Sequence, residues 1–261
     1  MNSAKKVIKR ALRRLGYDLV QYPSSETYGE HIKALLTTLD IDLVLDVGAH
    51  QGEYAFFLRE VGYSGRIISF EPVALNFAVI ARHCGHDRSW QVHNLALGSE
   101  DADRSMNVMS NSFLNSFLAP SEFGARSVDG NDIKSIEKVT VRRLDGLFDQ
   151  MLNAAGAHNV FLKMDTQGWD LEVLRGADAC ISRIGAVQSE VPLKAIYKGM
   201  PSFMAVITEC DRLGFEITGM FPVSRDTNNL AIVEFDCVMT RRRPKTAAFI
   251  VGVPRATDPL D

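Results

Sequence analysis

A glycine-containing turn that follows an acid is the first feature able to do chemistry. The stretch Leu43–Glu53 reads LVLDVGAHQGE, an apolar run that reaches Asp46 and continues through Gly48, His50 and Gly52. A strand that leads through such a turn into a helix presents backbone N–H groups where ligands of open α/β sheets bind. Asp46 would repel a pyrophosphate but accept hydrogen bonds from an ammonium group. The turn therefore favours a nucleoside that carries a cationic amino-acid group.

The glycine spacing excludes two common phosphate-binding loops. A dinucleotide fingerprint requires three glycines, at positions that here hold Gly48, His50 and Glu53. No Gly-Lys-Ser/Thr follows, so the turn is not a P-loop either. A nicotinamide-dependent oxidoreductase is therefore the weaker alternative. A non-catalytic binding scaffold is a second alternative that stays open.

A second acid, Glu71, directly follows the next apolar run, Arg66–Phe70. A carboxylate at the end of the second strand of an α/β nucleoside site can accept hydrogen bonds from both ribose hydroxyls. Either acid alone is a weak signal. Asp46 and Glu71 together, in successive strand–helix units, predict a nucleoside site.

Apolar runs and amphipathic segments alternate from residue 41 onward, which is typical of a parallel sheet covered by helices. The expected fold class is α/β, with a seven-stranded mostly parallel sheet and helices on both faces. The expected strands are Leu43–Val47, Arg66–Phe70, Gln91–Leu95, Val160–Met164, Ala186–Glu190, Phe215–Gly219 and Leu230–Met239. The expected helices are His31–Leu39, Glu53–Val61, Ala74–Cys84, Trp169–Ala179 and Ser202–Leu213.

Two segments and the C-terminal tail do not follow this alternation of strands and helices. Residues 4–16 are predicted to form a basic amphipathic helix, an N-terminal helical extension whose cationic face could contact an anionic membrane surface. Residues 99–138 are rich in Ser, Asn, Asp and Gly and are predicted to be a polar insertion with a function. The expected division is an N-terminal helix and connector at 1–40, one domain at 41–245 and a tail at 246–261.

Net charge, cysteine spacing and the N-terminal sequence limit the compartment and the partners that we expect for the protein. The chain has 261 residues and a formal net charge of −3, which gives no overall attraction to nucleic acid. Four widely spaced cysteines indicate reduced thiols, and the N-terminus lacks the apolar core of a signal peptide. We expect a cytoplasmic protein, peripheral to the membrane if the basic helix binds there. Homo-oligomerisation stays open.

Five motifs in a fixed order resemble one family. The chain is similar to S-adenosylmethionine-dependent methyltransferases of the FkbM family, which have the class I, Rossmann-like fold. The motifs span roughly residues 41–240 and read VLDVGAHQGEYAFFL, ISFEPVALNF, VHNLALGSEDA, FLKMDTQGWDLEVLRGA and VQSEVPLKAIYKGMPSF. The resemblance implies S-adenosyl-L-methionine as cofactor and O-methylation of a hydroxyl on a sugar, a glycolipid or polysaccharide unit, or a glycosylated natural product.

The resemblance also implies the residues that would contact the cofactor. The loop and its acid would hold the methionyl end, the second acid would hold the ribose, and one alanine would lie against adenine. In that order these residues are Asp46, Gly48, Ala49, His50 and Gly52, then Glu71, then Ala96. For His50 we favour a structural role, in which the imidazole fixes the loop by hydrogen bonding.

Methylation of an alcohol requires alignment of the reacting atoms and removal of a proton. By topology Asp165 and Glu190 project toward the same cleft as His50, and we rank Asp165 first and Glu190 second as the base or acceptor anchor. Lys163 could orient either carboxylate. The family often has Glu where this chain has Gln167, which removes one carboxylate, and no ligand cluster implies a metal.

Trp169 could line the acceptor site, although its helical spacing with apolar neighbours is more typical of a core residue. The insertion at 99–138 and the loop Tyr197–Met200 are expected to shape the acceptor pocket.

Overall fold

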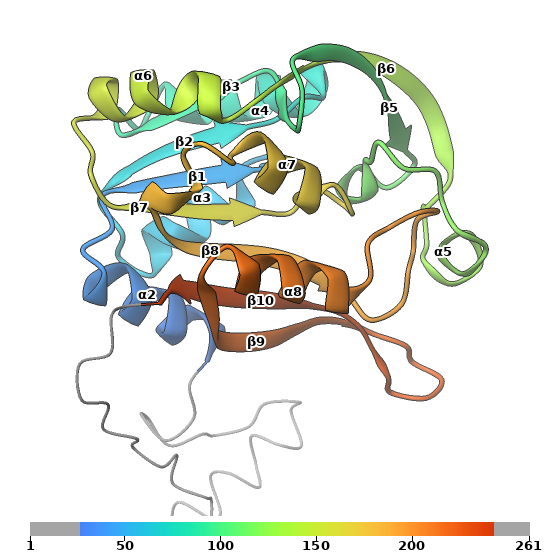
Figure 1. Cartoon of the computed structure of the whole chain (residues 1–261). Helices are drawn as coiled ribbons and strands as arrows, with labels where there is room; N and C mark the ends of the chain where they lie inside the picture. Colours follow the sequence, from blue (N-terminus) through green and yellow to red (C-terminus); the bar gives the residue numbers. More distant parts are fainter. Residues whose placement is uncertain (1–26, 243–261) are drawn as a thin grey trace, which may run out of the picture.

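A central seven-stranded sheet organises the chain. The computed structural model describes residues 27–242. The strand order is β3-β2-β1-β7-β8-β10-β9, and within this sheet only β10 runs antiparallel to its neighbours (Figure 1). The predicted α/β fold with a mostly parallel seven-stranded sheet is confirmed. The strands are β1 (Leu43–Val47), β2 (Arg66–Phe70), β3 (Trp90–His93), β7 (Val160–Met164), β8 (Ile184–Pro192), β9 (Phe215–Arg225) and β10 (Ile232–Arg241).

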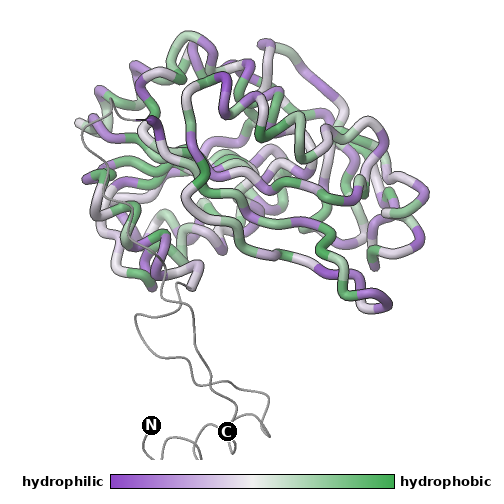
Figure 2. Tube along the Cα trace, turned by 60° about the horizontal axis from the view of Figure 1, so that its bottom comes forward, coloured by the Kyte–Doolittle hydropathy of each residue, from purple (hydrophilic) through white to green (hydrophobic). Residues whose placement is uncertain are grey.

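Helices cover both faces of this sheet, as predicted. One face packs against α6 (Asp145–Ala155), α7 (Asp170–Gly176) and α8 (Phe203–Arg212). The other packs against α2 (Tyr28–Thr38), α3 (Glu53–Glu60) and α4 (Ala74–Cys84). Strand alternation explains the division, because Leu43 and Leu45 of β1 join the first core and Val44 joins the second. The hydropathy trace shows apolar residues along the central strands and more hydrophilic turns around them (Figure 2).

The predicted polar insertion is largely ordered structure. Its strands β5 (Ala102–Met109) and β6 (Ile133–Arg142) form an antiparallel ribbon, which β4 (Ala96–Leu97) extends to three strands. A 3-10 turn, η1 (Ser112–Leu114), and a short helix, α5 (Glu122–Ser127), connect the two long strands. In Figure 1 the insertion lies beyond the carboxyl ends of β1 and β7, where the fold class places its ligands.

Apolar side chains of the insertion fasten it to the sheet. Leu114, Leu118 and Phe123 pack with Tyr197 and Met200 in a small separate core. The two segments that we expected to shape one pocket, 99–138 and 197–200, therefore lie in direct contact.

The structure corrects several predicted boundaries. The expected strand Gln91–Leu95 ends at His93, because the Asn94 amide donates to the carbonyls of Glu71 and Pro72, each at 2.9 Å, and turns the chain away. The following residues join the smaller sheet as β4. Helix α6 was not predicted, although Phe148, Met151 and Leu152 recur at helical spacing on its buried side.

Helix α2 largely matches the predicted helix His31–Leu39, and it packs on the sheet although its residues lie in the N-terminal segment 1–40 of the expected division. Thr27 and Glu30 form a reciprocal capping box at its start, and Ile32, Leu35 and Leu36 lie in the same core as β1. The expected division at residue 40 stays a prediction. The expected basic helix at 4–16, its membrane contact and the tail at 246–261 lie outside the described residues. Within residues 27–242, every helix is too short or too polar to cross a bilayer.

If α2 stabilises the domain, Ile32→Ala should lower the free energy of unfolding by about 2–5 kcal/mol, because it leaves a cavity under a fully buried side chain. Lys33→Ala on the exposed side of the same helix should change it by less than about 0.5 kcal/mol. Urea denaturation measures both, and equal effects would show that α2 is not part of the cooperative unit.

Candidate functional site

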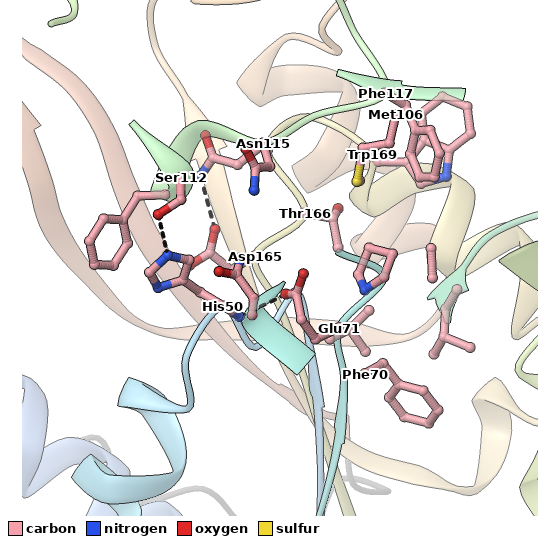
Figure 3. A pocket seen from close by; sticks show the side chains of 18 residues that line it. His50, Phe70, Glu71, Met106, Ser112, Asn115, Phe117, Asp165, Thr166 and Trp169 are labelled. Carbon is pink, nitrogen blue, oxygen red and sulfur yellow. Dashed lines mark hydrogen bonds between the residues drawn. The ribbon is translucent and has the colours of Figure 1, made fainter. Parts of the chain in front are cut away.

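A cavity opens at the carboxyl ends of β1, β2 and β7, under the insertion. The empty space between its walls is about 510 Å³, a figure that includes the open mouth. Five of the residues predicted to bind or act on a ligand line it (Figure 3): Gly48, His50, Glu71, Ala96 and Asp165. We call it the first cavity.

The glycines of the loop are required by close packing. Gly48 has φ +78°, and a Cβ there would lie 2.0 Å from the carbonyl oxygen of Asp165. Gly52 has φ +97°, and its Cβ would lie 2.5 Å from the Trp90 ring. The loop after β1 therefore lies directly against the turn after β7, and Gly52 caps α3 without lining the first cavity.

His50 ties the loop to the insertion. Its Nδ1 lies 2.9 Å from Glu53 Oε1 and its Nε2 lies 2.8 Å from Ser112 Oγ. The ring also lies 4.0 Å, centroid to centroid, from that of Phe113. With both ring nitrogens and one ring face engaged, this geometry supports the structural role that we favoured for His50.

Glu71 presents a buried carboxylate to the first cavity. One oxygen accepts from the backbone N–H of His50 and the other from that of Val73, both at 2.9 Å. A carboxylate has about four lone-pair directions, so acceptor capacity remains for a ligand. Burial raises the pKa of Glu71 to about 7, although these two N–H groups act to lower it. The side chain is thus an acceptor whose charge changes near neutral pH.

The opposite end of the first cavity is apolar and aromatic. Ala96 and Leu97 line it together with Met106, Phe117 and Trp169 (Figure 3). Trp169 does both of the things that the sequence left open, because it lines the cavity and packs against the main core. Its indole Nε1 is buried without a hydrogen-bond partner among the described residues. This end therefore offers a flat apolar slot.

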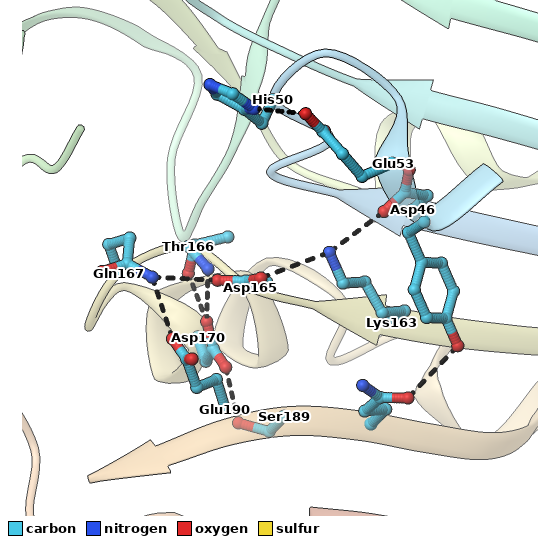
Figure 4. Close-up of polar contacts among 12 residues, drawn as sticks. Asp46, His50, Glu53, Lys163, Asp165, Thr166, Gln167, Asp170, Ser189 and Glu190 are labelled. Carbon is cyan, nitrogen blue, oxygen red and sulfur yellow. Dashed lines mark hydrogen bonds and ion pairs between the residues drawn. The ribbon is translucent and has the colours of Figure 1, made fainter. Parts of the chain in front are cut away.

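Asp46 does not reach the first cavity. The strand register places Ser69, Asp46, Lys163 and Gln188 in one row across β2, β1, β7 and β8, on the face covered by α2, α3 and α4. Asp46 is fully buried, accepts from Ser69 Oγ at 3.1 Å and lies 3.2 Å from Lys163 Nζ (Figure 4). The geometry therefore does not support direct binding of a ligand by Asp46.

Lys163 is a buried cation shared by two acids. Its Nζ lies 3.2 Å from Asp46 and 3.6 Å from Asp165. Burial acts to lower the pKa of Lys163, but the carboxylates of Asp46 and Asp165 outweigh it and hold that pKa above its ordinary value. Burial in turn raises the pKa of Asp46, and Lys163 only partly opposes it. Lys163 orients Asp165, one of the two carboxylates that the sequence analysis considered for it.

Gln167 joins the two predicted catalytic carboxylates. Its Nε2 donates to Asp165 Oδ1 at 3.0 Å and to Glu190 Oε2 at 2.8 Å (Figure 4). Its Oε1 lies 2.7 Å from the hydroxyl of Tyr197. The residue has φ +52°, an unusual value for a residue other than glycine. Gln167 is therefore an amide that holds the two acids together.

Asp165 and Glu190 differ in their access to the first cavity. The Asp165 side chain is 37% exposed and lines the first cavity, whereas Glu190 lines a different, smaller cavity beside Gly168 and Met200. Burial, and next the charge of Asp165, raise the pKa of Glu190 well above its ordinary value. Glu190 therefore meets the first cavity only through Gln167.

A second cavity adjoins the first at Gly48, His50 and Asp165. Its wall includes Ala49 of the loop and the polar groups of Lys163, Asp236, Tyr28 and Tyr54. Burial, and next the charge of Asp165, raise the pKa of Asp236 to about 6. No group of three or more His, Cys, Asp or Glu side chains suited to a metal ion occurs within residues 27–242.

Sequence reasoning missed several polar residues of these walls, among them Asp236 and Asn115. Asp236 lies in a strand that runs against the others, and Asn115 lies in the insertion, so neither has a spacing rule that places it at the site. The only signal for Asn115 was the polarity of the insertion itself.

Comparison with known proteins identifies the family. A family model described as the methyltransferase FkbM domain matches residues 46–217. The curated protein "Methyltransferase 1" of Beauveria bassiana is 27% identical over 150 residues, which cover 53% of this chain and 59% of that protein. The chain thus spans 59% of the length of this relative.

Two solved structures are among the similar ones. Methyltransferase FkbM from Methylobacillus flagellatus aligns with a TM-score of 0.44 at 17% identity, over 76% of this chain and 44% of that chain. Fibrillarin from Aeropyrum pernix, with natively bound S-adenosyl-L-methionine, aligns with a TM-score of 0.43 at 12% identity, over 91% and 73%.

The shared cation predicts a large effect on stability. Lys163→Met should lower the free energy of unfolding by about 3–5 kcal/mol, because it leaves the buried carboxylate of Asp46 without its cation. The same change in an Asp46→Asn background should cost clearly less. Lys138→Met removes an exposed pair with Asp103 and should cost less than about 1 kcal/mol. Additive effects of the changes at 46 and 163 in urea denaturation would contradict the pairing.

Proposed function

The chain belongs to the FkbM methyltransferase family, and we propose that it transfers a methyl group from S-adenosyl-L-methionine to a hydroxyl group of a carbohydrate. The acceptor class comprises sugars, glycolipid or polysaccharide units and glycosylated natural products. The observation that carries the proposal is the first cavity, which joins an accepting carboxylate, an apolar slot and the solvent-accessible carboxylate of Asp165.

The residues of the first cavity suit the nucleoside part of this cofactor. Glu71 can accept from a ribose hydroxyl, because the N–H groups of His50 and Val73 and the Asn76 side chain use only three of about four lone-pair directions of its carboxylate. The apolar slot at Ala96 and Leu97 suits the flat adenine ring.

The second cavity suits the amino-acid part. Lys163 would face the carboxylate of the methionyl group, and Asp236 would face its ammonium group. These residues take over the role that the sequence suggested for Asp46, which would instead hold Lys163 in place. The sulfur would then lie between the two cavities, beside Asp165.

S-Adenosyl-L-methionine, when bound, supplies an electrophilic methyl group. Asp165 would accept the proton of the acceptor hydroxyl, because it is the carboxylate that lines both cavities. Gln167 and Lys163 hold its two oxygens from either side. Glu190 would act on the acceptor only through Gln167, which makes it a positioning residue.

A carbohydrate suits the mouth of the first cavity. Phe113 stands at the rim with 58% of its surface exposed, next to the polar side chains of Ser112 and Asn115. Such a combination can pack on the apolar face of a sugar ring and hydrogen-bond its hydroxyls. Incubation of the protein with methyl-d3-labelled cofactor and a cell-envelope or metabolite extract tests the proposal. Mass spectrometry should find the label on a carbohydrate oxygen, and label confined to nitrogen or sulfur would refute it.

Cofactor affinity should depend on pH through Glu71. Because the pKa of this carboxyl is about 7, its accepting, ionised form is lost as pH falls through 7, and the Kd for S-adenosylmethionine should rise. Calorimetry should show this in the wild type. In Glu71→Gln the affinity should be about 10- to 100-fold weaker, and the change near pH 7 should be lost, which leaves only the dependence near pH 6 that comes from Asp236.

Glu234→Gln is the matched control, because burial also raises the pKa of Glu234 to about 7 but the residue does not line the first cavity. The control should keep the wild-type pH dependence. NAD should not bind to either protein, and tight NAD binding would favour the oxidoreductase alternative.

Substitutions of the carboxylates of Asp165 and Glu190 should have different effects on kcat. Asp165→Asn should lower kcat by about 10²- to 10⁴-fold, the range for loss of a general base, with a cofactor Kd changed by much less. Glu190→Gln should lower kcat less, since it alters only the support of Gln167. A larger loss in Glu190→Gln would reverse this assignment.

A further inference from the structure

Asn115 contributes an unused donor to the wall of the first cavity. Its Oδ1 accepts from the backbone N–H of Met109 at 2.9 Å, which fixes the orientation of the amide. Its Nδ2 is buried and has no hydrogen-bond partner among the described residues. In Figure 3 this nitrogen points into the cavity, toward the end that holds His50 and Asp165 and away from Trp169. A buried donor without a partner is unfavourable unless a ligand satisfies it.

The position of Asn115 is fixed by its neighbours on both sides. Ser112 bonds to His50 in the loop after β1. Ser116 is fully buried and donates from Oγ to the carbonyl of Gln167 at 2.8 Å, in the turn after β7. The amide is therefore held against the two segments that carry the other polar groups of this end of the cavity.

We propose that Asn115 binds the oxygen of the acceptor hydroxyl, an inference that rests on the proposed function. An alcohol oxygen has one proton and two lone pairs. Asp165 takes the proton, the Nδ2–H of Asn115 donates to one lone pair, and the other lone pair attacks the methyl carbon. The new O–CH₃ bond forms as the S–CH₃ bond of the cofactor breaks, and the electron pair of the broken bond stays on the sulfur.

This arrangement gives Asn115 two effects. It orients the attacking lone pair, and it stabilises the negative charge that develops on oxygen as the proton leaves. The Trp169 end of the cavity offers no comparable pair of donor and carboxylate.

Asn115→Asp separates this role from a structural one. The new carboxylate can still accept from Met109 N–H, but it has no N–H to donate. We expect kcat/KM for the carbohydrate acceptor to fall at least about tenfold, with the Kd of S-adenosylhomocysteine within about twofold of wild type. Asn111→Asp is the control, because Asn111 is exposed in the same insertion and accepts from Phe113 N–H through its Oδ1. It should leave both quantities unchanged.

The side-chain ¹⁵N resonance of Asn115 in the wild type gives a second readout. It should change little with S-adenosylhomocysteine alone and shift when the acceptor is added. A shift with S-adenosylhomocysteine alone, or unchanged kcat/KM in Asn115→Asp, would overturn the assignment. If the wild type methylates no hydroxyl, the proposed function fails and the acceptor assignment falls with it. The resonance with S-adenosylhomocysteine alone then shows whether the amide contacts the cofactor.

Discussion

The buried ammonium group of Lys163 connects the sheet to the chemistry at its edge. It lies between a fully buried acid of β1 and an accessible acid that follows β7. Without a cation at this point, two carboxylates would face each other across neighbouring strands in a medium of low polarity. Ser69 and Lys163 contact Asp46 across neighbouring strands, whereas Gln188 accepts a hydrogen bond from Tyr54 of α3. The position of Asp165 is thus set by the core of the sheet rather than by a loop.

The two sides of the first cavity are built differently. The central sheet supplies Glu71 and Asp165, which directly follow strands whose positions are set by the parallel register, and β4 of the smaller sheet supplies Ala96. The insertion supplies Met106 from β5, and Asn115 and Phe117 from the segment that connects β5 to β6. The part of the site proposed for the cofactor belongs mostly to the sheet. The part proposed for the acceptor belongs mostly to the insertion.

This division also explains how far the sequence could predict the site. Glu71 and the glycine loop follow strand ends, so local pattern was enough to bring them together. Asp46 was assigned to the ligand because sequence shows the acid but not the lysine opposite it, which lies 117 positions later and meets it only through strand register. Helix α6 does carry a local signal, the helical spacing of Phe148, Met151 and Leu152, which our sequence analysis missed. The extent of the ribbon and the orientation of the Asn115 amide depend on contacts distant in sequence, for which no spacing rule exists.

The hydrogen bond between His50 and Ser112 affects the rate at which a bound molecule enters or leaves the first cavity. It connects the loop after β1 to the insertion, on opposite sides of the first cavity. The hydrogen bond of Ser116 connects the insertion to the turn after β7 in the same way. A molecule that enters or leaves the cavity between these segments requires them to separate. The residence time of such a molecule is therefore linked to how often the ribbon separates from the sheet. A substitution that weakens either hydrogen bond would shorten that time even if every contact with the bound molecule stayed the same.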